Sequence, residues 1–258
     1  MSTENVWQEK ITPARFDGKT VIVTGAGSGI GKATALRVAQ EGGKVIAADI
    51  SGERLGELVA ENPELSIVAV AGDITDQHVV DRIVAAGEGK VDALANVAGI
   101  MDKFEPIHEV EDSTWERVFN VNLNSILKLT RSVVPLMLEA ESGTVVNVAS
   151  EAGLRGSAAG VAYTASKHAV VGMTKNSAVM YGKKGIRFNA VAPGAVQTNI
   201  EAPMDSAYAQ QVIAPLMSII PGMATAAQLA ASITFLLSDD STNINGVVLA
   251  SDTGWSAI

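Results

Sequence analysis

The sequence predicts an α/β fold in which seven parallel strands form a doubly wound sheet with helices on both faces. Three observations predict it: short β-branched runs alternate with longer helical stretches, most of these runs are almost continuously apolar, and a glycine-rich turn directly follows the first run. A strand that is covered by helices on both faces needs apolar side chains on both sides, so it lacks the alternation of a half-exposed strand. The repeated order of strand and helix is typical of right-handed βαβ units.

Seven short runs have the length and composition of buried strands. They are Thr20–Thr24, Lys44–Asp49, Ser66–Ala71, Val91–Asn96, Gly143–Ala149, Gly185–Val191 and Gly246–Ala250. Four longer stretches have helical periodicity, and Gly42 and Gly43 stop the first of them. These predicted helices run from Ile30 to about Gln40 and over Ser113–Leu138, Gly160–Tyr181 and Thr225–Leu237.

The composition is that of a folded, acidic protein. The 258-residue chain is 47% apolar, too much for an intrinsically disordered protein, and its formal net charge is −9. This charge argues against a nucleic acid or an anionic membrane as a partner, because both need a positive surface. The chain has no cysteine, which excludes disulfides, thiolate zinc sites and cysteine nucleophiles.

The chain has no internal repeat, linker or shift in composition. We therefore expect a single domain over residues 17–258, preceded by an extension of residues 1–16 that lies outside the core. The first 19 residues carry charges throughout and lack the apolar stretch of a signal peptide. No segment approaches the roughly 18 uninterrupted apolar residues of a membrane span. We expect a cytoplasmic protein that does not enter a membrane.

The glycine-rich turn, residues 24–31, joins the first predicted strand to the first predicted helix. Its glycines at positions 25, 29 and 31 have the spacing GxxxGxG. Glycine permits a tight turn and lets backbone N–H groups approach a pyrophosphate at the start of a helix. A glycine cluster by itself also marks an ordinary flexible turn, but the strand before it and the helix after it favour a dinucleotide site. We therefore predict a Rossmann-like fold.

Asp49 ends the second predicted strand, 49 − 31 = 18 residues after the last of these glycines. An acid about 20 residues past the glycines is expected to bind the ribose hydroxyls of the adenosine. Its charge would also repel the 2′-phosphate of NADP. Position 28 is a serine, and no Arg or Lys occurs in residues 50–52. The pattern predicts NAD as the cofactor, the alternative being an aspartate that only caps a helix or a turn.

Tyr163 and Lys167 lie four residues apart and therefore share one face of a predicted helix. Ser150 lies at the end of the fifth predicted strand, the edge at which doubly wound sheets bind their ligands. A lone YxxxK pattern is common in ordinary amphipathic helices. Together with the glycine-rich turn, these three residues indicate an active site.

These residues belong to a longer series of motifs. In chain order they are TGAGSGIG (24–31), GDI (72–74), NVAG (96–99), VNL (121–123), NVASEAG (147–153), YTASK (163–167) and PGAVQT (193–198). With this series the chain resembles the short-chain dehydrogenases/reductases, roughly from Phe16 to Trp255. Val97 departs from the family by replacing the second Asn of Asn-Asn-Ala-Gly, which would alter a contact that braces the sheet. Residues 252–254 read Asp-Thr-Gly where Asp-Gly-Gly is common, which puts the geometry of that loop in doubt.

The resemblance implies a catalytic role for each of four residues. Tyr163 would be the general acid/base, because a free tyrosine has a pKa of about 10 and an adjacent ammonium and the oxidised nicotinamide both favour its phenolate. Lys167 would supply that ammonium and hold the nicotinamide ribose. Ser150 would donate a hydrogen bond to the substrate oxygen. Asn122 would anchor a water that links Lys167 to solvent. Asn120 and Asn124 lie nearby, so the assignment to Asn122 depends on the alignment with the family.

The resemblance also implies the cofactor contacts. Besides Tyr163 and Lys167 they are Gly25, Ser28, Gly29, Ile30 and Gly31 at the phosphates, Asp49 and Ile50 at the ribose, Asp73 and Ile74 at the adenine, Asn96, Ala98 and Gly99 on the adenosine side, and Pro193, Gly194, Val196 and Thr198 at the nicotinamide carboxamide. The three histidines, at 78, 108 and 168, have no partners at metal-ligand spacing, so we predict no metal site. We interpret Glu151 as a solvated loop acid rather than a substrate-pocket residue.

Three functions compete at this point. The first is an NAD-dependent dehydrogenase or reductase that interconverts a secondary alcohol and a ketone. The second is a 3-oxoacyl-carrier-protein reductase, against which Asp49 and the acidic net charge argue, since that activity usually uses NADPH and needs a basic surface for its acidic carrier. The third is a non-catalytic dinucleotide sensor, which the complete catalytic group disfavours.

The substrate and the assembly are predicted only in outline. Residues 199–223 would form a lid, as in the family, and their apolar side chains favour a small apolar ketone or alcohol. The helices Ser113–Leu138 and Gly160–Tyr181 carry apolar or small residues on more than one face. The resemblance implies a homotetramer built from these helices and the last strand with its tail, the alternative being a monomer. Trp7 and Trp255 would pack against the body or a neighbouring subunit.

Overall fold

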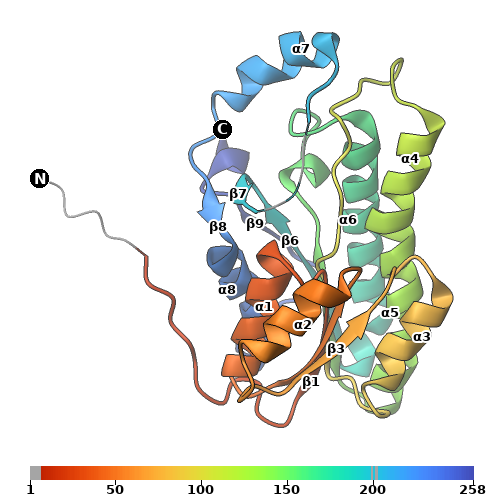
Figure 1. The fold of residues 1–258 in the computed structure, drawn as a ribbon, viewed down its shortest axis with the longest axis vertical. Helices are drawn as coiled ribbons and strands as arrows, with labels where there is room; N and C mark the ends of the chain where they lie inside the picture. The colour runs from red at the N-terminus through yellow and green to blue at the C-terminus, as the bar shows by residue number, and fades with distance from the viewer. Residues whose placement is uncertain (1–6, 199, 201–202) are drawn as a thin grey trace, which may run out of the picture.

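A seven-stranded parallel sheet forms the centre of the protein, as the sequence predicts (Figure 1). The computed structural model describes residues 7–198, 200 and 203–258. The strands are β1 (Thr20–Thr24), β2 (Lys44–Asp49), β3 (Ile67–Ala71), β4 (Ala93–Asn96), β5 (Gly143–Val148), β6 (Ile186–Pro193) and β9 (Val248–Ser251). β1 and β2 have the predicted bounds, and the other five differ from theirs by one or two residues at an end. A small second sheet, which the sequence did not predict, pairs β7 (Val196–Gln197) with β8 (Ala224–Thr225).

The order of the strands across the sheet is β3-β2-β1-β4-β5-β6-β9, and every pair is parallel. The chain moves outward from β1 in one direction and then, with β4, in the other. The helices that follow β1 and β4 therefore leave on opposite faces, and a crevice opens between the carboxyl ends of these two strands.

Helices cover both faces of the sheet (Figure 1). One face carries α1 (Gly29–Gln40), α2 (Gly52–Ala60) and α8 (Ala226–Leu237), and the other carries α3 (Gln77–Ala85), α4 (Asp112–Phe119), α5 (Ser125–Glu139) and α6 (Val161–Tyr181). Neighbouring strand residues serve opposite faces: Val21 and Val23 belong to the first core, whereas Ile22 belongs to the second. Both cores are therefore apolar, which explains why the strands lack alternation.

The predicted helix Ser113–Leu138 needs a correction, because it is interrupted. A π-helical segment, Asn120–Asn124, separates α4 from α5. A π-helical turn takes an extra residue and shifts the side chains that follow it, and such turns are frequent at functional sites. Asn122 is the buried residue of this segment. Apolar spacing did not reveal the interruption, since both halves keep their apolar face toward the protein.

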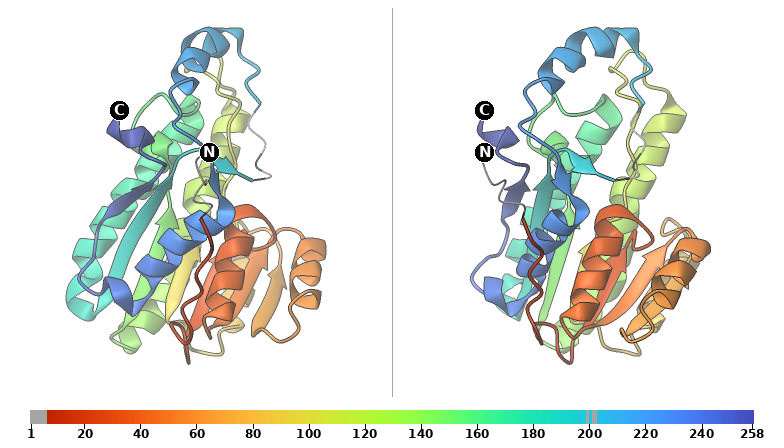
Figure 2. Two further views of the ribbon diagram at one scale, coloured as in Figure 1. Left: turned by 90° about the vertical axis from the view of Figure 1, so that its left-hand side faces the viewer. Right: turned by 60° about the vertical axis from the view of Figure 1, so that its left-hand side comes forward.

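Another helix, α7 (Ala207–Met217), lies beyond the carboxyl ends of the strands (Figure 2). It falls within the predicted lid, residues 199–223, of which residues 199, 201 and 202 lie outside the described residues. Several of its apolar side chains are exposed, among them Tyr208, Val212 and Leu216. Among the described residues, no helix is long and apolar enough to cross a membrane.

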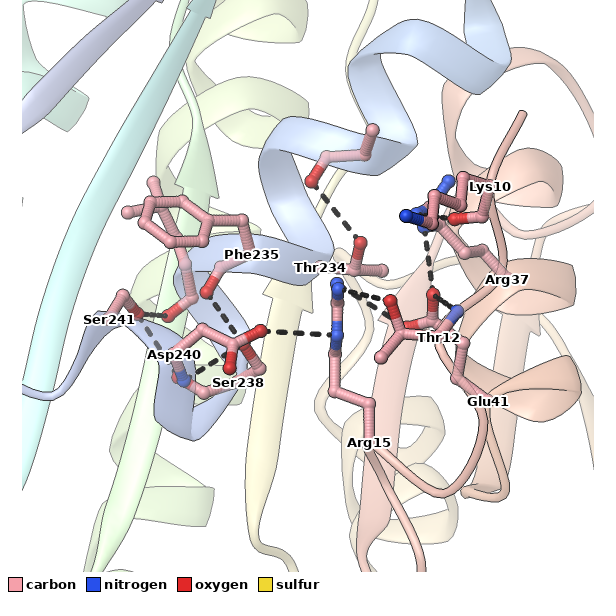
Figure 3. A network of polar contacts seen from close by, with 12 residues as sticks. Lys10, Thr12, Arg15, Arg37, Glu41, Thr234, Phe235, Ser238, Asp240 and Ser241 are labelled. Carbon is pink, nitrogen blue, oxygen red and sulfur yellow. Dashed lines mark hydrogen bonds and ion pairs between the residues drawn. The ribbon is translucent and has the colours of Figure 1, made fainter. Parts of the chain in front are cut away.

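The segment before β1 is tied to the domain by a network of charges (Figure 3). Glu41, at the end of α1, is fully buried, accepts a hydrogen bond from the N–H of Thr12 and forms ion pairs with Arg15 (3.6 Å) and Arg37 (3.3 Å). Phe16 is only 2% exposed and belongs to the core, which therefore begins one residue earlier than the boundary expected from the sequence. Residues 1–6 of the expected extension lie outside the described residues.

This network generates a prediction about stability. We expect Glu41→Gln to lower the free energy of unfolding by about 2 kcal/mol, because it removes the buried charge that Arg15 and Arg37 share. Each arginine then keeps an exposed partner, Asp240 for Arg15 and Glu9 for Arg37. Urea denaturation followed by circular dichroism measures the loss. The matched control is Glu88→Gln, which removes an exposed ion pair with Lys44 and should cost less than about 1 kcal/mol. Similar small losses in both variants would contradict a stabilising role for the network.

Candidate active site

A cavity of about 620 Å³ opens at the carboxyl ends of the strands, where the strand order reverses. Most of the predicted cofactor residues line it. They are Gly25, Ser28, Gly29, Ile30, Gly31, Asp49, Ile50, Asp73, Ile74, Ala98, Gly99 and Thr198. These residues come from the ends of four strands and from the residue that follows β7, so only the folded sheet brings them together. The volume is in the range of small-molecule and cofactor sites.

The glycine-rich turn brings the backbone of β1 against the backbone that follows β4. Gly25 has a φ of +68°, and a Cβ added there would lie 3.0 Å from the Cα of Ala98. Thr24 fixes the same junction, because its hydroxyl accepts hydrogen bonds from the N–H groups of Val97 (2.9 Å) and Ala98 (3.1 Å). This contact sets the floor of the cavity.

The first turn of α1 faces the cavity with free hydrogen-bond donors. Ser28 is its N-cap but makes no side-chain cap bond, and the first turn contains no acidic residue. The first N–H groups of a helix have no partner within the helix, and the helix dipole adds positive potential there. The arrangement suits a phosphate or pyrophosphate, which fits the binding of a dinucleotide.

Asp49 is buried at the end of β2 and is held in place from three sides. Its Oδ2 accepts a hydrogen bond from the N–H of Gly27 (2.9 Å), and its Oδ1 accepts one from the N–H of Ser51 (2.9 Å). Arg54 in α2 adds an ion pair at 2.8 Å. The sequence analysis missed both Gly27 and Arg54. Arg54 could have been found, because it is a basic residue in the first turn of the helix that follows Asp49.

Three of the predicted catalytic residues lie close together: Ser150, Tyr163 and Lys167. Tyr163 and Lys167 are 8% and 2% exposed on one face of α6, and the Nζ of Lys167 lies 5.4 Å from the centre of the Tyr163 ring. Lys167 donates a hydrogen bond to the carbonyl of Val148 in β5 (2.8 Å). Ser150, two residues after β5, lies near the Tyr163 phenol and acts to lower its pKa. The Nζ of Lys167 lies 3.5 Å from where a Cβ on Gly99 would stand, which connects the group to the cavity.

Burial moves the pKa values of this pair in opposite directions. It raises the pKa of Tyr163 to about 12, although Ser150 works in the other direction. It lowers the pKa of Lys167 to about 8. Both shifts have the same cause, since a group away from water prefers its neutral form. A cation beside the phenol would therefore be needed to produce the phenolate near neutral pH.

Asn122 holds the loop after β4 rather than leaving its side chain free for a water. Its carbonyl oxygen accepts a hydrogen bond from the N–H of Ile100 (2.8 Å), and its amide donates to the carbonyl of Ile100 (2.9 Å) and to Ser166 (3.3 Å). Both amide protons are used. The role implied for Asn122, to anchor a water that links Lys167 to solvent, stays a prediction.

Asn96 has a structural role, and the cofactor contact implied for it stays a prediction. Its side chain is 2% exposed and does not line the cavity. The amide donates to Asn147 in β5 (2.8 Å) and to Thr130 in α5 (3.2 Å), so it braces the sheet and the helix beneath it. Asn147 in turn donates to Thr174 in α6 (2.9 Å). The neighbouring Val97 lines the cavity, and its side chain packs against the first core.

The turn after β6 lies partly outside the cavity. Thr198 reaches it, whereas Pro193, Gly194 and Val196 are not among the described residues that line it. Gly194 instead lies against Asp252 at the end of β9, because a Cβ added at Gly194 would be 2.9 Å from the Cβ of Asp252. The nicotinamide contacts implied for these three residues stay predictions.

Glu151 is buried, so its interpretation as a solvated loop acid is wrong. It is 1% exposed and forms an ion pair with Arg155 at 2.8 Å. Burial and the neighbouring carboxyl group of Asp252 raise its pKa to about 7, against the opposing charge of Arg155. Arg155 also donates to the carbonyl of Trp255 (2.6 Å), whose side chain packs against the body and is 4% exposed. The cluster fastens the C-terminal tail beside Ser150.

The remaining polar clusters offer no second reactive site. The three histidines are exposed, and among the described residues no group of three or more metal-ligating side chains comes together. A second cavity, of about 340 Å³, lies near the amino ends of β4 and β5. Arg187 in this cavity donates to the carbonyls of Leu236 and Ser238, which makes it a structural brace.

Comparison with known proteins identifies the family. The family model of the short chain dehydrogenases matches residues 19–209. The chain belongs to the short-chain dehydrogenase family. It is 41% identical over 251 residues to a 3β-hydroxysteroid dehydrogenase 2 of Eggerthella lenta, a match that covers 93% of this chain and 95% of that protein.

Solved structures of the family have the same fold. The crystal structure of levodione reductase is similar with a TM-score of 0.84 and 36% identity, over 94% of this chain and 99% of that one. A structure described as an NAD(P)-dependent gluconate 5-dehydrogenase of Beutenbergia cavernae, with NADP bound at low occupancy, has a TM-score of 0.84 and 35% identity over 96% of this chain and all of that one. The protein is therefore an oxidoreductase of a family that uses nicotinamide dinucleotides.

The Glu151 cluster predicts how stability depends on pH. Because its pKa rises from 4.5 to about 7 on folding, the folded protein holds a proton that the unfolded chain releases, and stability falls as the pH rises through this window. One such group contributes a slope of up to about 1.4 kcal/mol per pH unit. Glu151→Gln should flatten the slope in urea denaturation between these values, whereas the control Glu139→Gln, at an exposed position, should retain it. The same slope in wild type and Glu151→Gln would contradict the assignment.

Proposed function

We propose that the protein is an NAD(H)-dependent oxidoreductase that interconverts a secondary alcohol and a ketone. The observation that carries the proposal is the joint placement of Ser150, Tyr163 and Lys167 beside a dinucleotide-sized cavity with Asp49 at its ribose end. A bound nicotinamide dinucleotide supplies or accepts the hydride. The residues of the chain bind the cofactor, orient the substrate and move the proton.

The proton chemistry belongs to Tyr163 and its neighbours. In ketone reduction the phenol gives its proton to the substrate oxygen, and in alcohol oxidation the phenolate takes it back. Ser150 donates a hydrogen bond to the same substrate oxygen and stabilises the charge that develops there. Lys167, held by Val148, places a positive charge near the phenol and favours the phenolate. The burial of both groups strengthens this effect, because little water screens them.

Asp49 favours NAD over NADP, and Arg54 limits how strong the preference is. Two N–H groups hold the Asp49 carboxylate where it can accept hydrogen bonds from ribose hydroxyls, and a 2′-phosphate would face its charge. Arg54 neutralises part of this charge, and its side chain is 45% exposed, so it is free to turn toward a phosphate. We therefore propose NAD as the preferred cofactor rather than the exclusive one.

The substrate proposed is a small, largely apolar ketone or secondary alcohol. Its binding region would lie between Ile100, Met101 and the segment before α7, where Ile200 and Pro203 line the cavity. The apolar side chains of α7 would cover it as a lid. The names of the relatives, a levodione reductase and a hydroxysteroid dehydrogenase, are consistent with cyclic ketones and alcohols.

Two alternative functions have less support. A 3-oxoacyl-carrier-protein reductase is disfavoured by Asp49 and by the net charge of −9, which would repel an acidic carrier. A non-catalytic sensor is disfavoured by the assembled catalytic side chains. An acetoacetyl thioester tested beside a panel of linear and cyclic ketones distinguishes the three, since a sensor would reduce none of them.

We also propose that the protein assembles as a homotetramer through α4, α5, α6 and the C-terminal tail. These elements carry strongly exposed apolar side chains: Val179 is 81% exposed, Met180 64%, Leu127 48% and Ile258 67%. Apolar groups in such number on neighbouring helices indicate a surface that another subunit covers. Closed two-fold symmetry would pair each helix with its own copy.

Tyr163→Phe tests the catalytic assignment. We expect kcat to fall by about 1,000-fold, because the variant lacks the proton donor, while the affinity for NADH, measured by fluorescence titration, stays nearly unchanged. The control Tyr181→Phe makes the same substitution on the same helix, where Tyr181 packs against Phe188. Its kcat should stay near that of the wild type. Turnover by Tyr163→Phe at the wild-type rate would refute the assignment.

A pair of variants at the ribose end tests the cofactor preference. We expect the wild type to have a higher kcat/KM with NADH than with NADPH. Asp49→Ala should reduce this ratio by at least about tenfold, because it removes both an acceptor for the ribose and a repulsive charge. Arg54→Gln should increase the ratio, because it leaves the charge of Asp49 uncompensated. Equal or better efficiency of the wild type with NADPH would overturn the preference.

A further inference from the structure

Asp102 is a buried carboxylate that the proposed reaction leaves unused. It lies in the loop between β4 and α4, is 1% exposed and lines the cavity. Over the described residues no cation forms an ion pair with it, and the adjacent Lys103 is directed to Asp205 at 3.9 Å. Burying a carboxylate without a counter-ion costs free energy unless hydrogen bonds compensate for the lost water.

Three main-chain N–H groups supply these bonds. Oδ1 of Asp102 accepts from Phe104 (3.0 Å) and from Gly160 (3.1 Å), and Oδ2 accepts from Tyr163 (2.9 Å). Gly160 is the N-cap of α6 and has no side chain with which to cap it. Asp102 therefore caps the catalytic helix from a loop 58 residues earlier in the chain. A carboxylate at this place pairs N–H groups that a helix start leaves free and interacts favourably with the helix dipole.

The approach of this loop to α6 is unusually close. A Cβ added at Gly160 would lie 2.6 Å from Oδ2 of Asp102 and 2.6 Å from the N of Glu105, so it would push the loop away from the helix. Phe104 has a φ of 61°, a left-handed conformation that costs a non-glycine residue about 1–2 kcal/mol. Its N–H is one of the three that Asp102 binds. The loop is thus held in a strained conformation against the start of the helix.

The same loop reaches the cofactor cavity. Residues 97–103 all line the cavity. Asn122 fixes the loop at Ile100 by two hydrogen bonds, and Asp102 fixes it at α6 by two more. Loop 97–103 therefore lines the cavity at Gly99 and binds the main chain of Tyr163 through Asp102. In this way the loop couples the position of Tyr163 to that of a ligand in the cavity.

We propose that Asp102 is a positioning residue, whose carboxylate holds Tyr163 at a fixed place relative to the cofactor-lining loop 97–103. The proposal rests on the proposed function for its kinetic consequences. Asp102 acts through the main chain of Tyr163 and touches neither the substrate nor the phenol in this role.

The charge of Asp102 gives the proposal a distinctive signature. The groups that face Tyr163 are Lys167 on the same helix, Ser150 after β5, Asp102 on the loop, and the apolar Val118 on α4. Burial contributes most to the raised pKa of Tyr163, Ser150 lowers it, and the negative charge of Asp102 raises it further. Removing that charge therefore favours the phenolate.

The test is Asp102→Asn, which keeps the size of the side chain but removes its charge and one acceptor. We expect kcat for ketone reduction to fall up to about 100-fold with little change in KM, because a displaced general acid affects the reacting geometry more than binding. In alcohol oxidation, which needs the phenolate, the rise of kcat with pH should move to lower pH. Steady-state kinetics over a range of pH measure both effects.

The control is Asp112→Asn, which makes the same substitution at an exposed acid in the first turn of α4. Both its kcat and its pH profile should match those of the wild type. A loss of kcat in Asp102→Asn that only parallels a loss of thermal stability, with an unmoved pH profile, would make Asp102 a structural residue and overturn the proposal. An unchanged kcat would overturn it as well.

A second variant covers the case in which Asp102→Asn does not fold. Gly160→Ala keeps the charge and displaces the carboxylate from the helix, so it should lower kcat while the pH profile stays closer to that of the wild type. An unchanged kcat in folded Gly160→Ala would then overturn the proposal.

Amide hydrogen exchange separates this proposal from the proposed function. If the wild type reduces no ketone with NADH, the proposed function fails, but exchange still reports on Asp102. The first turn of α6 should exchange faster in Asp102→Asn, or in Gly160→Ala if the first variant does not fold, than in the wild type, with α5 unchanged. Unaltered exchange at Tyr163 would overturn the positioning role, whatever the activity.

Discussion

The site depends on the close contact between the carboxyl ends of β1 and β4. Thr24 binds the two N–H groups that follow β4, and Gly25 lets the backbones approach to a distance that a side chain would prevent. The helices after these strands leave on opposite faces, so the contact lies at the bottom of the crevice. The glycine-rich turn and the loop of residues 97–103, which contacts the main chain of Tyr163 through Asp102, both begin at this junction.

Helix α6 is fixed to the loop after β4 and to β5 at three levels. Asp102 binds its first turn, Lys167 reaches the carbonyl of Val148 in its second, and Thr174 accepts a hydrogen bond from Asn147 further along. Asn147 is itself bonded to Asn96, at the end of β4. Rigid attachment of this kind keeps reacting groups in place before the substrate binds, which is how a site gains from preorganisation.

Burial gives the site its electrostatic character. Tyr163 and Lys167 are both shifted toward their neutral forms, and Glu151 beside Ser150 is shifted in the same sense. Asp49 and Asp102 are buried carboxyl groups that accept hydrogen bonds from main-chain N–H groups. Both line the cavity, Asp49 at the end of β2 and Asp102 beside the start of α6.

The sequence by itself determined the fold class, the seven strands and twelve of the described residues that line the cavity. These features depend on local patterns: apolar runs for buried strands, glycine spacing for the turn, and the four-residue spacing that puts Tyr163 and Lys167 on one face. Residues that lie at the ends of parallel strands must meet at one edge of the sheet, so their position in the chain is enough to place them.

Only the tertiary structure decided what each polar side chain binds. Asn96 lies within a cofactor motif yet braces the sheet, Glu151 lies in a polar loop yet is buried, and Arg54 pairs with Asp49 from the next helix. Asp102 belongs to no motif and caps a helix 58 residues away. A hydrogen bond or an ion pair is decided by distances of a few ångström between segments far apart in the chain. Hydrophobic periodicity and motif spacing carry no information on those distances.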